Sequence, residues 1–337
     1  MTIMNKIRWG LLSTARINRR LIPAIRASAQ GELVAVASRT RRSADAYAAE
    51  WGIPRAFGSY EAMIASGEID AVYIGLPNHL HARWTVNALE HGLHVLCEKP
   101  FALSLSEVDR MIDAARDNGR VLAEAFMYRH HPQTKTVGKF VRGGRLGEVT
   151  VMRGTFSFRI DRAAHGIRLV PEWGGGSLWD VGIYPLSLAQ FVMGEPPVWV
   201  FGDQWVGPDG VDESFTGLLH YEGGAMAQIS SSFRAPFHTH FELLGTKGRL
   251  AIARPFNGIE DPEANLTFFD ESGAAHDIPF PSQDLYHGED EDMHQAILTM
   301  RPPYIGLNET RDHVRTALAL YESARRGERV FLEEIRR

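Results

Sequence analysis

The sequence predicts an α/β domain with a parallel sheet, followed by an α+β domain with a large, mostly antiparallel open-faced sheet. Up to about residue 127, β-rich runs alternate with amphipathic helical stretches, which is typical of a parallel sheet with helices on both faces. After residue 148, longer strands follow one another with few helices between them. With 337 residues and 44% hydrophobic content, the chain can bury two cores. We therefore expect one domain at 1–127 and a second at 128–337.

A strand, a tight turn and a helix fit into the first twenty residues, an opening that suits a dinucleotide-binding domain, although an ordinary βα turn is the alternative. In such domains the N-terminus of the helix binds the pyrophosphate of a dinucleotide. Ser13 and Ala15 stand where the first two glycines of the G-x-G-x-x-G pattern would be, and Asn18 stands where the last would be. Small side chains still let the backbone approach a phosphate. The residues of this turn that we expect to bind the cofactor are Ser13, Thr14, Ala15, Arg16 and Ile17.

The second predicted strand, 33–38, ends in hydroxyls and guanidiniums. A site specific for NAD usually has an acidic residue there, which binds the ribose 2′-hydroxyl. This chain has none, and arginine suits a 2′-phosphate because its planar group makes two contacts at once. We therefore expect NADP, with NAD less favoured, bound by Ser38, Arg39, Thr40 and Arg42. The alternative is a solvated basic turn before a helix with its N-cap at Ser43.

Two further strands, 71–76 and 94–97, are expected to end at the carboxyl edge of the sheet, where open α/β sheets bind ligands. The residues at the end of the first, which we expect to shape the nicotinamide site, are Leu76, Pro77, Asn78 and His81. The second strand is followed by Glu98, Lys99 and Pro100, and we expect Glu98 and Lys99 to contribute to the cofactor site. An ammonium at this edge is either a catalytic group or the partner of Glu98 in a buried pair.

The remaining elements follow from the same signals. We expect a strand at 121–126, and helices that end at Gly52, Gly67, Gly92 and Gly119, where a left-handed residue closes the last turn. In the second domain we expect strands at 149–158, 214–221, 225–233, 238–245 and 249–253, with turns at 222–224 and 246–248. A last helix is expected at 309–326. The acidic run 289–292 precedes another helix, and we expect a solvated helix start there and no metal site.

A glycine run at 174–176 leads into a predicted helix capped by Ser177. Asp180 and Tyr184, spaced i and i+4, would share one face of this helix. Pro185 either kinks the helix or marks the first turn of the actual one. A phenol is a weak base at its ordinary pKa, but a neighbouring ammonium stabilises the phenolate, and Lys99 is the expected partner. The alternative for Tyr184 is a core tyrosine with a satisfied hydroxyl.

Composition narrows the choice of partners. The net charge of −5 argues against a nucleic-acid surface, and no apolar run is long enough to span a bilayer. Cys97 is the only cysteine, which excludes an internal disulfide and a cysteine-cluster metal site, as expected in a reducing cytoplasm. No signal-peptide pattern precedes the first strand. We therefore expect a cytoplasmic protein that binds neither nucleic acid nor a membrane.

These motifs together make the chain resemble the Gfo/Idh/MocA oxidoreductases over nearly its whole length. The resemblance depends on 98–100, on Pro77-Asn78-x-x-His81, on 124–132 and on Asp180-x-Gly182-x-Tyr184. Much of the family has histidine at the position of Tyr184. The chain is therefore similar to the tyrosine-bearing branch, which includes glucose-fructose oxidoreductase, NADP-linked xylose dehydrogenases, dihydrodiol dehydrogenases and deoxysugar 3-ketoreductases. Departures from the glycine pattern also occur in that branch.

The resemblance implies an NADP-dependent enzyme that transfers a hydride between nicotinamide and a secondary or anomeric hydroxyl of a sugar or cyclic polyol. Tyr184 would take the hydroxyl proton as the hydride leaves the same carbon, and Lys99 would orient that hydroxyl. Asp180 would bind a neighbouring hydroxyl. Arg129, His131 and Trp173 are candidates for the sugar pocket, although His131 precedes a proline and could instead cap the following helix.

Two alternative functions use the same residues differently. A 3-ketoreductase of a nucleotide-linked deoxysugar would run the reaction in reverse with NADPH and would need cations for a diphosphate, with Arg159, Arg162 and Arg168 as candidates. A non-catalytic NADP-binding regulator would have no need for Lys99 and Tyr184 together, which disfavours it. The open-faced sheet is expected to form homodimers or homotetramers, as in relatives.

Overall fold

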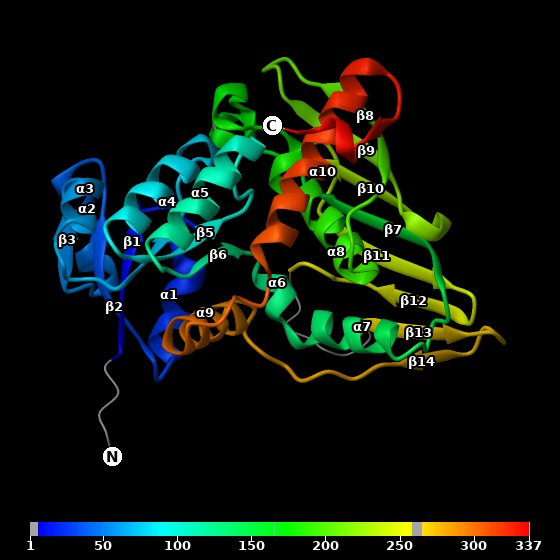
Figure 1. Ribbon diagram of the computed structural model, residues 1–337, viewed down its shortest axis with the longest axis horizontal. Coiled ribbons are helices and arrows are strands. Elements are labelled where there is room, and N and C mark those ends of the chain that lie inside the picture. The colour runs from blue at the N-terminus through cyan, green and yellow to red at the C-terminus, as the bar shows by residue number, and fades with distance from the viewer. Residues whose placement is uncertain (1–5, 165, 258–264, 337) are drawn as a thin grey trace. The chain divides into compact units, whose positions relative to one another are not determined.

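The structure is a computed structural model that describes residues 6–164, 166–257 and 265–336 (Figure 1). Contacts between residues divide them into two compact units. The first contains the residues up to His130 together with Tyr286–Thr310, and the second contains His131–Leu285 together with the residues from Arg311 onward. No helix among the described residues is long and apolar enough to cross a membrane.

The first unit is built on a six-stranded parallel sheet with the strand order β3-β2-β1-β4-β5-β6. Its strands are β1 (Ile7–Leu12), β2 (Gly31–Ala37), β3 (Arg55–Phe57), β4 (Ala71–Ile74), β5 (His94–Glu98) and β6 (Leu122–Ala125). The predicted parallel sheet is thus confirmed. Because the order runs outward from β1 in both directions, the gap beyond the carboxyl ends of β1 and β4 is the switch point where such sheets bind ligands.

The helices of the first unit end as expected, but one begins differently. They are α1 (Asn18–Ala27), α2 (Arg41–Trp51), α3 (Tyr60–Ile64), α4 (His81–Glu90), α5 (Leu105–Asp117), α6 (Met127–His130) and α9 (His287–Thr299). The predicted glycines at 52, 67, 92 and 119 all have positive φ after α2, α3, α4 and α5. The N-cap expected at Ser43 is wrong. Thr40 caps α2 instead, because its extended backbone lets its hydroxyl accept the N–H of Ser43 at 3.2 Å.

The acidic run 289–292 lies inside α9 and not before it. Glu289 and Asp290 have exposed fractions of 2% and 0%, so the expected solvated helix start is wrong. They are buried because α9 packs against α1 and because His294 accepts a hydrogen bond from the indole of Trp9 in β1 at 2.8 Å (Figure 1). Through these contacts α9 belongs to the first unit, outside the range 1–127 that the sequence pattern assigns to the nucleotide-binding domain.

The second unit is built on a nine-stranded sheet with the strand order β14-β13-β12-β11-β7-β10-β9-β8-β15. The strands are β7 (Val149–Ser157), β8 (Trp199–Val206), β9 (Asp212–His220), β10 (Met226–Ser232), β11 (His238–Gly245), β12 (Gly248–Ile252), β13 (Leu266–Asp270), β14 (Ala275–Asp277) and β15 (Val330–Phe331). All pairs are antiparallel except β10 with β7. The five predicted strands match β7, β9, β10, β11 and β12 to within two residues, and the mostly antiparallel sheet is confirmed.

One face of this sheet is covered by helices (Figure 1). The helices of the second unit are α7 (Pro132–Arg142), α8 (Ile183–Met193) and the part of α10 (Leu307–Arg326) that begins at Arg311. α8 packs against β7 and β10, and α7 packs against α8. Gly154 of β7 lies under Pro185 of α8, where an added Cβ would come within 2.7 Å of the proline. The sheet also has an outward face with exposed side chains, among them Arg153, Phe201, Trp205, Met226 and Gln228.

Candidate active site

The turn after β1 keeps a glycine-like conformation without glycine. Ser13 has φ of 139°, in the region that favours glycine. Its hydroxyl donates to the carbonyl of Gly75 at 3.0 Å and accepts the N–H of Ala15 at 3.2 Å. The amide of Asn18 donates to the carbonyl of Ser13 at 2.7 Å. Hydrogen bonds from small polar side chains thus stabilise the backbone shape that the missing glycines usually supply.

The N-terminus of α1 is suited to an anion. Its N-cap, Ile17, makes no side-chain hydrogen bond, and the first turn holds no acidic residue. The partial positive charge of the helix is therefore not neutralised there by a carboxylate. A hollow of about 650 Å³ lies beside it, lined by Thr14, Arg16, Arg19, Ser43, Ala46, Tyr47 and Glu50. Cations and hydroxyls from the turn, α1 and α2 therefore line this space, together with the carboxylate of Glu50, which pairs with Arg19 at 2.8 Å.

Some residues after β2 make contacts within the protein, and others are exposed to solvent. Thr40 is engaged in capping α2, and its hydroxyl donates to the hydroxyl of Ser43 at 2.8 Å. Arg41 pairs with Asp45 at 2.8 Å. Arg39 and Arg42 are exposed. Ser38, also predicted to bind the cofactor, is buried at 8% exposure. The guanidiniums of Arg39, after β2, and Arg42, in the first turn of α2, have no acid between them and fit the 2′-phosphate of NADP better than the 2′-hydroxyl of NAD.

Two loops at the carboxyl edge of the sheet are joined by His81. Its buried ring lies 2.9 Å from the carbonyl of Leu76 and 2.9 Å from that of Pro100. Burial lowers the pKa of this imidazole below its ordinary value. A neutral ring has one N–H and donates to one of these carbonyls, so it lies between the loop after β4 and the loop after β5. Pro77 and Asn78 lie in the first of these loops.

Glu98 and Lys99 lie at the end of β5, as predicted. The Glu98 carboxylate accepts the hydroxyl of Tyr73 at 2.5 Å and the backbone N–H of Lys99 at 3.2 Å. Burial raises the pKa of Glu98, and the charge of Lys99 opposes that rise. Cys97, one residue earlier, is buried, which agrees with a packed small hydrophobic residue. The carboxyl edge of the sheet thus carries a cation next to a carboxylate that accepts two hydrogen bonds.

In the second unit, the segment with Asp180 begins as a π-helical turn, Leu178–Gly182, and continues as α8. Pro185 lies in the first turn of α8, which settles the choice between a kink and a helix start. Ser177 stands at the N-cap position of this segment, as predicted, but its side chain makes no capping hydrogen bond. Ser177 has helical φ and ψ, and its hydroxyl donates to the buried carboxylate of Asp212 at 2.8 Å.

Asp212 fixes the start of the π-helical turn. The N–H of Leu178 donates to it at 2.8 Å and the hydroxyl of Tyr321 at 2.7 Å. Gly176 is required here, because its φ is 119° and an added Cβ would lie 2.0 Å from the Asp212 carboxylate. The sequence pattern did not single out Asp212. The acidic pair Asp212 and Glu213 at the start of an apolar strand was the available signal.

Tyr184 combines an apolar ring environment with charged neighbours. It is 6% exposed, and its ring centroid lies 5.3 Å from that of Phe156 and 5.5 Å from that of Phe256. Asp180 pairs with Arg168 at 2.5 Å. Asp180 raises the pKa of the Arg168 guanidinium, and Tyr184 contributes in the same direction. A phenol, a carboxylate and a guanidinium are therefore within electrostatic reach of one another. The partnership of Tyr184 with Lys99 stays a prediction.

The three loosely predicted sugar contacts have different surroundings. Arg129 is 1% exposed and pairs with Glu309 at 2.6 Å. His131 is the N-cap of α7, where its ring accepts the N–H of Gln133 at 3.2 Å, so the capping alternative is confirmed. Trp173 is 42% exposed. Of the three, Trp173 has the surface most accessible to a ligand, and a sugar-binding role for any of them stays a prediction.

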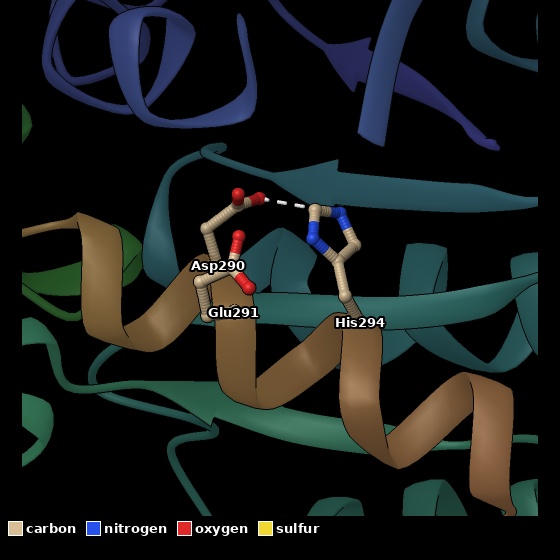
Figure 2. A group of neighbouring side chains, drawn as sticks. All are labelled: Asp290, Glu291 and His294. Carbon is tan, nitrogen blue, oxygen red and sulfur yellow. Dashed lines mark ion pairs between the residues drawn. The ribbon is translucent and has the colours of Figure 1, made fainter. Parts of the chain in front are cut away.

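The buried acidic group of α9 is drawn in Figure 2. Asp290, Glu291 and His294 offer ligand atoms within 4.8 Å of one another, a geometry open to a metal ion. The imidazole, however, accepts the indole N–H of Trp9 at 2.8 Å with Nε2, so its Nδ1 carries the proton toward Ser28 Oγ at 3.1 Å. Ser28 in turn donates to Glu291 at 2.6 Å. This directional chain uses both ring nitrogens and links His294 to Glu291 by hydrogen bonds. The carboxylate oxygens of Asp290 have no hydrogen-bond partner among the described residues, and one of them lies 3.5 Å from His294 Nε2 (Figure 2).

Comparison with known proteins agrees with this geometry. The model of the "oxidoreductase family, NAD-binding Rossmann fold" matches residues 7–126, and that of the "GFO/IDH/MocA C-terminal domain" matches residues 134–251. The chain belongs to the Gfo/Idh/MocA oxidoreductase family. The resemblance found in the motifs is thereby confirmed, and the protein is an oxidoreductase.

Relatives of this Gfo/Idh/MocA oxidoreductase include sugar enzymes. D-xylose 1-dehydrogenase (NADP(+)) 2 of Haloferax volcanii is 40% identical, with 96% of this chain and 99% of the relative covered. An aldose-aldose oxidoreductase from Caulobacter crescentus, solved with glycerol, is 28% identical with a TM-score of 0.88, covering 97% and 100% of the two chains. A 3-ketoreductase from Actinomadura kijaniata, solved with NADP and TDP-benzene, is 28% identical with a TM-score of 0.87, covering 95% and 98%.

Proposed function

We propose that this oxidoreductase uses NADP to transfer a hydride between nicotinamide and a hydroxyl-bearing carbon of a free sugar or cyclic polyol. The observation that supports this most is the group in the second unit, where Tyr184 has Asp180 and Arg168 as charged neighbours. Such a group has both parts that alcohol oxidation needs: a phenol that can exchange a proton and a charged pair that can bind hydroxyls. A regulator without catalysis would need neither.

The residues fit NADP at two places. The exposed Arg39, after β2, and Arg42, in the first turn of α2, would bind the 2′-phosphate, and the N-terminus of α1 would bind the pyrophosphate. When bound, the nicotinamide accepts or supplies the hydride. In the oxidation direction, Tyr184 takes the proton of the substrate hydroxyl, and Lys99 orients that hydroxyl and favours the phenolate. Asp180 accepts a hydrogen bond from the adjacent hydroxyl.

A free sugar is favoured over a nucleotide-linked one. A diphosphate needs cations, and two of the three candidate arginines are already paired with acids in the second unit. Arg162 pairs with Glu213 and with Asp209, and Arg168 pairs with Asp180. Arg159 is exposed. The relative from Haloferax volcanii acts on D-xylose, which supports an aldose as the first substrate to test.

We further propose that the protein is a cytoplasmic homodimer, with a homotetramer as the second candidate. The outward face of the nine-stranded sheet exposes Phe201 and Trp205 of β8 and Met226 of β10, at 38–44% each. A paired sheet would remove this apolar surface from water. Sedimentation of the wild type and of a Phe201→Asp variant tests the proposal, since the variant should shift toward the monomer. A monomeric wild type at micromolar concentration would reject it.

The enzymatic proposal is tested by measuring NADP and NAD reduction with aldoses, cyclic polyols and dihydrodiols, in parallel with Tyr184→Phe. We expect NADP-dependent oxidation of at least one free aldose, lost in the variant. NADPH consumption with a 3-keto nucleotide sugar and none with free sugars would favour the 3-ketoreductase alternative. No turnover with any of these substrates, despite NADP binding, would favour the regulator.

A further inference from the structure

Backbone contacts with the glycine run 174–176 fix the position of Arg168 in the loop before Tyr184. Arg168 lies in a short helical turn, Ile167–Leu169, and its carbonyl accepts the N–H of Gly176 at 3.0 Å. Gly175 packs so closely that an added Cβ would lie 2.6 Å from this carbonyl oxygen. The glycine run 174–176 therefore allows close packing of the backbone around Arg168.

The side chain of Arg168 is fixed at its other end by Asp180. Its Nε donates to Oδ2 of Asp180 at 2.5 Å, and its guanidinium lies 5.8 Å from the centroid of the Phe158 ring. The arginine side chain is 46% exposed and the aspartate 15%. The ion pair is therefore partly open to solvent, and its carboxylate lies on the π-helical turn that continues into α8, the helix of the phenol expected to exchange a proton.

On the basis of the proposed function, we propose that Arg168 is a positioning residue of the reaction. It holds the Asp180 carboxylate where it binds the hydroxyl next to the reacting carbon, and its positive charge favours the phenolate form of Tyr184. Nothing in the sequence pattern linked Arg168 to these two residues, because they lie twelve or more positions away across a glycine run.

The physical reason lies in the surroundings of the phenol. Phe156 and Phe256 provide an apolar environment, which disfavours a negative charge, so a nearby cation has a large effect. The negative charge of an ionised Tyr184 helps to raise the pKa of Arg168. Because electrostatic coupling is mutual, the positive charge of Arg168 stabilises the Tyr184 phenolate by the same amount. A carboxylate has about four acceptor positions, so Asp180 held by Arg168 can still accept a sugar hydroxyl.

The test compares Arg168→Met, which removes the charge, with Arg168→Lys, which keeps it, and with Arg234→Met as a control. Arg234 is an exposed cation of the same unit that stacks on Trp205 at 3.7 Å. For Arg168→Met we expect kcat/KM for the sugar to fall roughly 10- to 100-fold, while NADP affinity stays unchanged. Arg168→Lys should restore part of the loss, and the control should behave as wild type.

A second measurement does not need activity. The alkaline titration of tyrosinate absorbance in each protein, minus that of the same protein with Tyr184→Phe, isolates the phenol of Tyr184. Its midpoint should move up by about 1 pH unit in Arg168→Met, less in Arg168→Lys, and not in Arg234→Met. An unmoved midpoint together with unchanged kcat/KM would overturn the inference. Failure of the proposed function would be distinct, because the wild type would then oxidise no sugar while the titration still reported on Arg168.

Discussion

Burial of Asp290 and His294 makes the stability of this protein depend on pH in an unusual direction. Burial raises the pKa of Asp290 to about 8 and lowers the pKa of His294 to about 4. Between these values the native pair holds one proton. This proton can lie on the Asp290 carboxyl or on the His294 ring. The carboxyl is favoured, because Nε2 of the ring accepts the indole N–H of Trp9. The proton count of the folded pair therefore does not depend on this assignment.

The sign and size follow from the unfolded chain. There the aspartate ionises at about pH 4 and the histidine at about pH 6.5, so the unfolded pair holds one proton between these values and none above. Folded and unfolded states then differ only between about pH 6.5 and 8, where the folded state holds one proton more. In that window the free energy of unfolding falls by about 1.4 kcal/mol for each pH unit. The pair therefore lowers it by about 2 kcal/mol as the pH rises from about 6.5 to 8.

Urea unfolding of the wild type and of Asp290→Asn, repeated from pH 6 to pH 9, measures this effect. Asparagine does not titrate, and His294 is neutral in both states above about pH 6.5. In the variant, this pair therefore adds nothing to the pH dependence of the free energy of unfolding above about pH 6.5. Subtracting the two curves removes the contributions of groups that do not interact with Asp290. The difference should change by about 2 kcal/mol between pH 6.5 and 8, with the wild type becoming relatively less stable as pH rises. Parallel curves over this range would refute the argument, since Asp290 would then be ionised in the native state.

The remaining predictions concern catalysis, the cofactor and the support of the site. Tyr184→Phe should lower kcat by roughly 10²–10⁴ and leave NADP affinity and thermal stability near wild type, and near-normal turnover would remove Tyr184 as the acid/base. Arg39→Ala should weaken NADP binding by about 1.5–3 kcal/mol and NAD binding much less, as measured by titration of both cofactors; equal losses would contradict recognition of the 2′-phosphate. Lys99→Met should slow oxidation and move the basic limb of its pH profile, whereas a slower reaction with an unmoved limb would leave Lys99 only a structural role. Asp212→Asn should cost about 1–3 kcal/mol in urea unfolding and reduce kcat, because Tyr321 and Ser177 lose a charged acceptor, and unchanged stability would argue against its support of the π-helical turn.

Local signals in the sequence were sufficient for much of the fold. Alternating strands and helices, with glycine at the helix ends, predicted the parallel sheet, and the turns at 222–224 and 246–248 lie between strands of the second sheet. Five of the described strands were not predicted: β3, β8, β13, β14 and β15. β14 and β15 are three and two residues long, too short to show a period of two, and they exist because a neighbouring strand offers them hydrogen bonds.

The candidate site divides in the same way. Lys99, Asp180 and Tyr184 could be selected from the sequence because each lies in a short motif whose chemistry is readable within a few residues. Their environment could not. The pairing of Asp180 with Arg168 and the bond of Ser177 to Asp212 join residues from different elements, so they depend on how the chain packs.

The sequence by itself determined the class of this protein: a parallel nucleotide-binding sheet, an antiparallel second sheet, and basic residues where an NAD site would have an acid. These properties are carried by side-chain period, turn residues and the order of motifs along the chain. Only the tertiary structure decided that the acidic start of α9 is buried, since Trp9 and His294 are 285 positions apart and meet through packing. Burial changes the charge a carboxyl can hold, because water no longer solvates it, and no local pattern of residues contains that information.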